Sequence, residues 1–112
     1  MYGLTVLKIG AALGFKEVKK KAIECIKNDH VRHVPRGVEK NLFASGDLTS
    51  AEVIAIIGSC RGDCYETDKH HFLGLDVHIL KPRGKYDGFY VKFYFVDPDI
   101  LFISVHFSEI RG

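Results

Sequence analysis

The sequence predicts a single α+β domain in which helices come first and an antiparallel sheet follows. Two patterns carry this prediction. Up to Gly58, apolar residues recur three and four positions apart, which is typical of one side of a helix, and after Gly58 they alternate with other residues, which is typical of strands. A chain of 112 residues with 46% hydrophobic content can bury one core without disulfides or a structural metal.

The helical part is predicted to span residues 15–58. A first helix over 15–28 follows from the apolar stripe that begins at Phe15 and Val18. A short second helix follows Pro35 and stops near Gly46, and a third begins at Thr49 and ends at Gly58. The start of the third helix is the best defined, because Thr49 and Glu52 have the spacing of a capping box.

The sheet is predicted to span residues 59–109. Alternating residues mark three strands, at 75–80, 89–96 and 100–107, and a weaker pattern over 61–67 suggests a fourth. Residues 82–88 and 97–99 contain the Pro, Gly and Asp that are typical of turns. We therefore expect three to four antiparallel strands with the helices packed on one face.

Pairing of the last two strands predicts which side chains share a face. If residues 97–99 form a three-residue loop, Tyr90 lies opposite His106 and Lys92 opposite Ser104. The other face is then wholly apolar and is predicted to carry the helices, with Phe89, Val91, Phe93, Phe95, Leu101, Ile103, Val105 and Phe107. His78 joins the polar face if Leu75, Val77 and Ile79 face the core.

The polar face has the residue types that cleavage of a phosphodiester requires. His and Tyr side chains can exchange protons with the attacking and leaving oxygens, Lys and Arg can bind phosphate, and exposed aromatic rings can stack on unpaired bases. Candidate catalytic residues are His78, Tyr90, Lys92 and His106, and candidate RNA-binding residues are Lys81, Arg83, Lys85 and Tyr94. No metal or cofactor is needed. Tyr, Lys and His are also common on an ordinary solvent-facing sheet surface, which is the alternative interpretation.

Cysteine and charge patterns limit the other possible functions. Cys60 and Cys64, with His70 and His71 nearby, suggest a zinc site, but their spacing is not the usual one and buried thiols are the simpler interpretation. Three cysteines are too few for a disulfide framework, which favours a reducing cytoplasm. The net charge of +2 does not by itself indicate a nucleic-acid partner, although the first 45 residues are basic and the rest acidic.

Two further segments are expected to have structural rather than catalytic roles. Residues 1–14 are apolar but lack a basic leader and contain Lys8, so we expect them to pack on the core as a helix or strand rather than to direct export or span a membrane. His30 and His33 fall between predicted helices, where capping or surface roles are expected.

Several short strings resemble the RelE/ParE-like superfamily of bacterial toxin ribonucleases, and within it the motility quorum-sensing regulator (MqsR) toxins. The resembling strings are 17–20, 56–58, 63–65, 76–77, 81–82, 90–93 and 102–106, over a match of about residues 15 to 109. The resemblance implies metal-independent cleavage of mRNA, inhibition by an antitoxin protein, and site roles for Tyr90, Lys92 and Lys81. Glu66 stands where the family has a catalytic Lys, so that His70, His71, His78 or His106 would supply the acid and the base.

The favoured expectation is thus a cytoplasmic, toxin-type endoribonuclease in which His78 or His106 acts as base or acid, Tyr90 orients or donates a proton, and Lys92, Lys81 and Arg83 hold phosphate. The alternative is a non-catalytic domain on the same scaffold whose exposed sheet face binds a protein. A metal-binding regulator that uses Cys60 and Cys64 is a third, weaker possibility.

Overall fold

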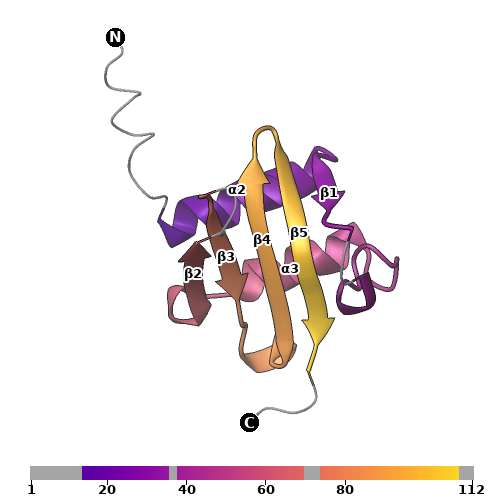
Figure 1. The fold of residues 1–112 in the computed structure, drawn as a ribbon. Helices are drawn as coiled ribbons and strands as arrows, with labels where there is room; N and C mark the ends of the chain where they lie inside the picture. The colour runs from indigo at the N-terminus through magenta and orange to yellow at the C-terminus, as the bar shows by residue number, and fades with distance from the viewer. Residues whose placement is uncertain (1–13, 36–37, 70–73, 109–112) are drawn as a thin grey trace.

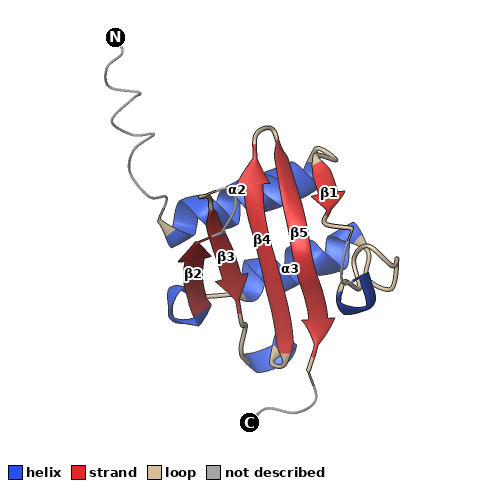
Figure 2. Ribbon diagram, in the orientation of Figure 1, coloured by secondary structure: helices blue, strands red, loops and turns tan. Residues whose placement is uncertain are grey.

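A computed structural model describes residues 14–35, 38–69 and 74–108, and these form a five-stranded sheet with two α-helices on one face (Figure 1). The helices are α2 (Phe15–Lys27) and α3 (Ser50–Ser59), and both lie behind the sheet when its open face is viewed (Figure 2). The expected α+β class is confirmed. The packing expected of residues 1–14 lies outside the described residues, apart from Gly14.

The sheet has the strand order β1-β5-β4-β3-β2. Its members are β1 (Val31–His33), β2 (Tyr65–Lys69), β3 (Asp76–Leu80), β4 (Phe89–Val96) and β5 (Asp99–Phe107). β1 pairs with β5 in parallel, and the other pairs are antiparallel. The prediction of a purely antiparallel sheet of three to four strands therefore missed one short strand, β1, which is parallel to its neighbour. Three residues are too few to show alternation, so His33 was placed between helices when it lies in a strand.

Local sequence signals account for the two helices. Thr49 Oγ1 accepts a hydrogen bond from the Glu52 amide at 3.1 Å, and the Glu52 carboxylate accepts one from the Thr49 amide at 2.8 Å, so the predicted capping box is present. The second predicted helix is shorter than expected, since only the 3₁₀ helix η1 (Val38–Lys40) forms and turns follow to Gly46. No helix in the described part of the chain is long and apolar enough to cross a membrane.

The main core lies between the two helices and the sheet. Helix α2 contributes Val18, Ala22, Cys25 and Ile26, and α3 contributes Val53, Ile56 and Ile57. The sheet contributes Leu80, Val91, Phe93, Ile100, Phe102 and Val105. Phe93 and Phe102 are fully buried, and burial of such side chains is the main favourable contribution to folding. The predicted core face was correct for Val91, Phe93 and Val105.

The β4–β5 pairing differs from the prediction near the turn. Val96 pairs with Asp99, so the loop has two residues rather than three, and Phe102 faces the helices where Ile103 was expected. A β-bulge opposite Lys92 and Phe93 then takes up one extra residue on β5. Beyond the bulge the predicted pairs are restored, with Lys92 opposite Ser104 and Tyr90 opposite His106. The two deviations compensate one another, so the predicted neighbours in the site are correct.

The face predicted for β3 was wrong. His78 pairs with Phe93 and lies on the helix-covered face, while Val77 and Ile79 lie on the open face with Tyr94. His78 is only 6% exposed. Both faces of β3 are apolar, so alternation alone could not determine which one the helices cover.

Candidate functional site

A pocket of about 480 Å³ lies where the β3–β4 connection meets the paired ends of β4 and β5. Its lining includes Glu66, Lys81, Arg83, Tyr90 and His106, and η2 (Gly62–Cys64) contributes to one side. Four of the eight side chains predicted for the site therefore share one pocket. Segments far apart in the sequence meet here because antiparallel pairing brings the start of β4 beside the end of β5.

Tyr90 and His106 line this pocket side by side. They are cross-strand partners whose rings stack with centroids 5.1 Å apart and planes inclined by 30°. Lys81 Nζ lies 6.0 Å from the centre of the Tyr90 ring. A proton donor, an imidazole and a cation are thus within reach of one small ligand group, which is the minimum set for acid-base chemistry on an anion.

His106 is held by a chain of two polar groups. Its Nδ1 atom lies 3.0 Å from Ser104 Oγ, and Ser104 Oγ donates to the Lys40 carbonyl oxygen at 3.2 Å. The pKa of His106 is lowered, chiefly by burial and also by the charge of Lys40, while a hydrogen bond to the Lys40 backbone opposes this. The imidazole is therefore neutral near pH 7 and is able to accept a proton.

Gly88 shapes the rim of the pocket. Its φ of +102° is a conformation that side chains disfavour, and a Cβ atom there would lie 2.6 Å from Cε1 of Phe107. The Ser108 amide donates to the Gly88 carbonyl oxygen at 2.8 Å, which holds the turn against the end of β5. Glycine is needed here because the backbone passes directly over an aromatic ring.

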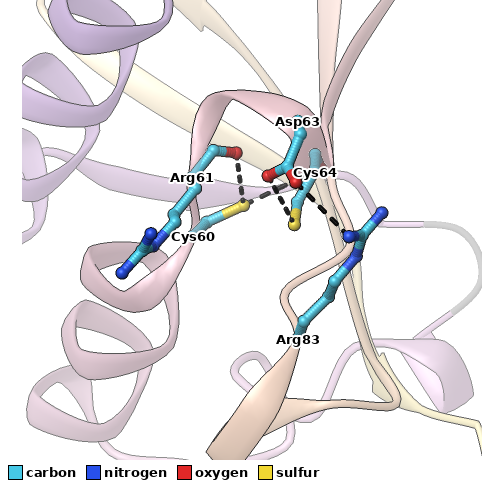
Figure 3. Close-up of polar contacts among 5 residues, drawn as sticks. All are labelled: Cys60, Arg61, Asp63, Cys64 and Arg83. Carbon is cyan, nitrogen blue, oxygen red and sulfur yellow. Dashed lines mark hydrogen bonds and ion pairs between the residues drawn. The ribbon is translucent and has the colours of Figure 1, made fainter.

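The two cations on the pocket wall each contact a carboxylate. Lys81 Nζ lies 3.0 Å from Glu66 Oε2, and Arg83 Nη1 lies 3.3 Å from Asp63 Oδ2 (Figure 3). The Lys81 and Arg83 side chains are 52% and 72% exposed. Ion pairs as exposed as these typically contribute only about 0–1 kcal/mol, so both cations can turn to a bound phosphate at little cost.

The remaining predicted residues do not line the pocket. Lys92 shares the face of Tyr90 but lies farther along β4, opposite Ser104 and Ile79. Lys85 projects from η3 (Gly84–Tyr86) and lies over the Tyr86 ring at 5.6 Å. Tyr94 is 7% exposed within the apolar cluster on the open face, so little of its ring is available to stack on a base.

His78 is a satisfied core histidine rather than a member of the site. Its Nδ1 atom lies 2.8 Å from the Tyr65 hydroxyl, and its ring packs against Phe93 and Phe95. Burial is the main cause of its lowered pKa. The predicted convergence of His78 with Tyr90 and His106 was wrong, because the intervening sheet separates them.

Cys60 and Cys64 lie together at the end of α3, beside Asp63 (Figure 3). Both thiols are buried, and burial together with contact with Cys64 raises the pKa of Cys60 to about 11. Within the described residues, no three His, Cys, Asp or Glu side chains are placed to hold a metal ion. His70 and His71, which the zinc hypothesis needs, lie outside the described residues.

Sequence reasoning missed two contributors to the site. Lys40 supplies a carbonyl oxygen and a nearby positive charge to His106 from η1, and Asp63 supplies the carboxylate that contacts Arg83. Neither has a local signal in the sequence, because each contact joins residues at least 20 positions apart. Comparison of the chain with protein-family models, with curated proteins and with solved structures gave no match.

Proposed function

We propose that this protein is a metal-independent endoribonuclease that cleaves mRNA at the pocket containing Tyr90 and His106. The observation that supports it most is the stacking of these two rings, at 5.1 Å, inside a pocket that also contains Lys81 and Arg83. Each group has one of the roles that RNA cleavage needs: base, acid, and charge stabilisation of the phosphate.

The proposed reaction is an internal transfer of the phosphate. His106 takes the proton of a ribose 2′-hydroxyl, and the 2′-oxygen forms a bond to phosphorus. The bond from phosphorus to the 5′-oxygen breaks, and the Tyr90 hydroxyl gives that oxygen its proton. The products are a 2′,3′-cyclic phosphate and a free 5′-hydroxyl, and proton exchange with water restores both side chains.

Cations around the pocket provide the charge stabilisation. Lys81 and Arg83 leave Glu66 and Asp63 when RNA binds, since a polyanion competes well with an exposed carboxylate. Lys92, which lies opposite Ser104 in the sheet, and Lys40, whose charge acts on His106, add positive charge near the pocket for the RNA backbone. Lys85 and Tyr94 take no part in the proposed chemistry.

The resemblance to RelE/ParE-like and MqsR toxins supports the same proposal, since helices packed on one face of a sheet are what it implies. Under this proposal the protein acts in the cytoplasm on mRNA, and a cognate antitoxin protein inhibits it. Glu66, in the place of the family's catalytic Lys, makes His106 the group that replaces it.

The test is cleavage of an unstructured RNA by the purified protein in EDTA. We expect cleavage to persist in EDTA, with 2′,3′-cyclic phosphate and 5′-hydroxyl ends, and Tyr90→Phe to lower the rate by at least about a hundredfold. Tyr86→Phe is the matched control, because Tyr86 is a partly buried tyrosine that does not line the pocket. Absence of cleavage by the wild type, with and without ribosomes, would overturn the proposal.

A second candidate function is a protein-binding domain, and the open face of the sheet favours it. Val77, Ile79 and Tyr94 form an apolar cluster there, with Leu101 and Ile103 packed against them. Neither α2 nor α3 covers this face (Figure 1). Leu101 and Ile103 are only partly buried, and apolar side chains that stay partly exposed together on one face are typical of a protein-binding surface.

The candidate binding face can be probed with a hydrophobic dye that fluoresces on apolar surfaces. If the face binds proteins, Leu101→Gln should lower dye binding more than Phe107→Gln does, although Phe107 is 48% exposed, because Phe107 lies outside the cluster. An inactive wild type together with that result would favour the binding domain. Equal effects of the two substitutions would count against it.

A further inference from the structure

Ser104 occupies a position between the imidazole of His106 and the backbone of a distant segment. Its Oγ atom lies 3.0 Å from His106 Nδ1 and 3.2 Å from the carbonyl oxygen of Lys40, which is 64 residues away in the sequence. Ser104 is 7% exposed, so water competes little for its hydroxyl. A buried hydroxyl between two polar groups has a defined hydrogen-bond direction.

The direction follows from the chemistry of the three groups. The Ser104 hydroxyl donates to the Lys40 carbonyl oxygen, which can only accept, so the single hydroxyl proton of Ser104 is used there. The Ser104 oxygen must then accept from His106, which requires a proton on Nδ1. A neutral imidazole carries one proton, so the lone pair of His106 lies on Nε2, on the other side of the ring from Ser104.

His33 shows the opposite arrangement in the same sheet. The side-chain oxygen of Asn41 accepts from the amides of Phe43 and Ala44 at 3.1 and 3.0 Å, so its amide group donates to His33 Nδ1 at 3.1 Å. The lone pair of His33 is therefore on Nδ1 and its proton on Nε2. The neighbours of each ring, rather than any common preference, determine its tautomer.

We propose that Ser104, anchored by the Lys40 carbonyl, is a positioning residue that holds His106 with its proton on Nδ1 and its lone pair on Nε2, facing the pocket. This inference rests on the proposed function, and it assigns His106 to the role of base. Nε2 takes the proton of the 2′-hydroxyl, and the positive charge that forms on the ring is stabilised because the Nδ1 proton remains bonded to Ser104. Ser104 itself touches no substrate.

Nitrogen NMR of isotope-labelled protein measures this tautomer directly, without RNA. At about pH 8, where imidazoles are neutral, wild-type His106 should show a protonated Nδ1 and an unprotonated Nε2. Ser104→Ala should shift the ring toward the other tautomer, and Ser104→Thr, which keeps the hydroxyl, should retain it. His33 is the internal control, since its signals should be the same in all three proteins.

Ser59→Ala is the matched substitution, because Ser59 also donates its hydroxyl to a carbonyl oxygen, that of Ile56 at 2.7 Å, away from His106. It should leave the His106 signals unchanged. Ser104→Ala should also lower kcat for RNA about tenfold or more, with a much smaller effect on KM, because orientation of the base and not binding is lost.

The outcomes separate the positioning role from the function. A wild-type His106 with its proton on Nε2, or an unchanged tautomer in Ser104→Ala, overturns the role of Ser104 even if RNA is cleaved. The expected tautomers together with no RNA cleavage support the positioning and overturn the function. A change in the His33 nitrogen signals of Ser104→Ala would mean that the substitution disturbs the sheet. In that case Ser104→Thr is the test. A retained His106 tautomer in Ser104→Thr supports the positioning role, and a changed one overturns it.

Discussion

His78 and His106 lie on opposite faces of the same sheet, and the difference between them separates a structural histidine from a candidate catalytic one. His78 is buried on the helix-covered face, forms a hydrogen bond with Tyr65 and packs against two phenylalanine rings. His106 lies in a pocket, stacks on Tyr90 and is bonded to Ser104. Burial lowers the pKa of both. A lowered pKa therefore does not by itself identify the catalytic histidine. What distinguishes His106 is its position in a pocket beside a second group that can transfer a proton.

The largest difference is expected in activity. His106→Ala should lower RNA cleavage by at least about a hundredfold, the effect of losing a general base, and His78→Ala should retain most of the activity at a temperature where it is folded. Circular dichroism fixes that temperature, and single-turnover rates on one RNA compare the variants. Equal losses of cleavage activity in the two variants would show that the two faces do not differ in their role in catalysis.

Stability should show the reverse order. His78→Ala removes a buried ring and leaves the Tyr65 hydroxyl without its partner, so we expect the free energy of unfolding to fall by about 2–4 kcal/mol. His106 is partly exposed, and His106→Ala should cost about 1 kcal/mol or less. Urea unfolding measures both values. A greater loss of unfolding free energy for His106→Ala would mean that the open face contributes more to stability than its burial indicates.

The dependence of stability on pH sharpens the same comparison. Burial lowers the folded-state pKa of His78 below the ordinary value of 6.5, so the unfolded chain binds a proton more readily. The stability that this group contributes is fully present above pH 6.5 and is lost as the pH falls from there toward the folded-state pKa. His33 and His106 contribute in the same direction.

His78→Gln removes the titrating group while keeping a polar side chain near Tyr65. Its free energy of unfolding should fall less steeply than that of the wild type below pH 6.5, where one proton accounts for at most about 1.4 kcal/mol per pH unit. Urea titrations at several pH values measure the slopes. Parallel curves for the two proteins would show that His78 does not titrate differently on unfolding.

The smallest expected effect concerns the charges at the pocket. Glu66→Gln releases Lys81 for phosphate and should lower KM for RNA by roughly two- to fivefold at low salt, with less effect at high salt. Asp68→Asn is the matched control, because it makes the same charge change on β2 but does not line the pocket. Equal changes in the two variants would indicate net charge alone rather than release of Lys81.

Alternation predicted the parts of the site that lie on β4 and β5. Tyr90 and His106 were paired from the residue pattern, and they are partners in the sheet, because a strand fixes which residues share a face once two strands are aligned. The prediction did not include the two-residue turn or the bulge. Either one alone would have moved His106 out of register with Tyr90.

The face of β3 could not be predicted in this way. Val77 and Ile79 indicated the core side, but they belong to the open-face cluster, while His78 and Leu80 face the helices. Apolar residues on both sides of a strand leave two solutions of similar hydrophobic gain. The Tyr65 hydroxyl, which satisfies a buried imidazole, favours the one that is observed.

The sequence by itself determined the two α-helices, the capping box at Thr49 and the strands that follow Gly58, because these depend on residues a few positions apart. Only the tertiary structure decided which face of β3 the helices cover, and with it that His78 is buried while His106 lies in a pocket. It also decided the contacts of His106 with Ser104 and Lys40, because a hydrogen bond across 64 residues depends on how the segments pack, and local sequence patterns carry no information about that.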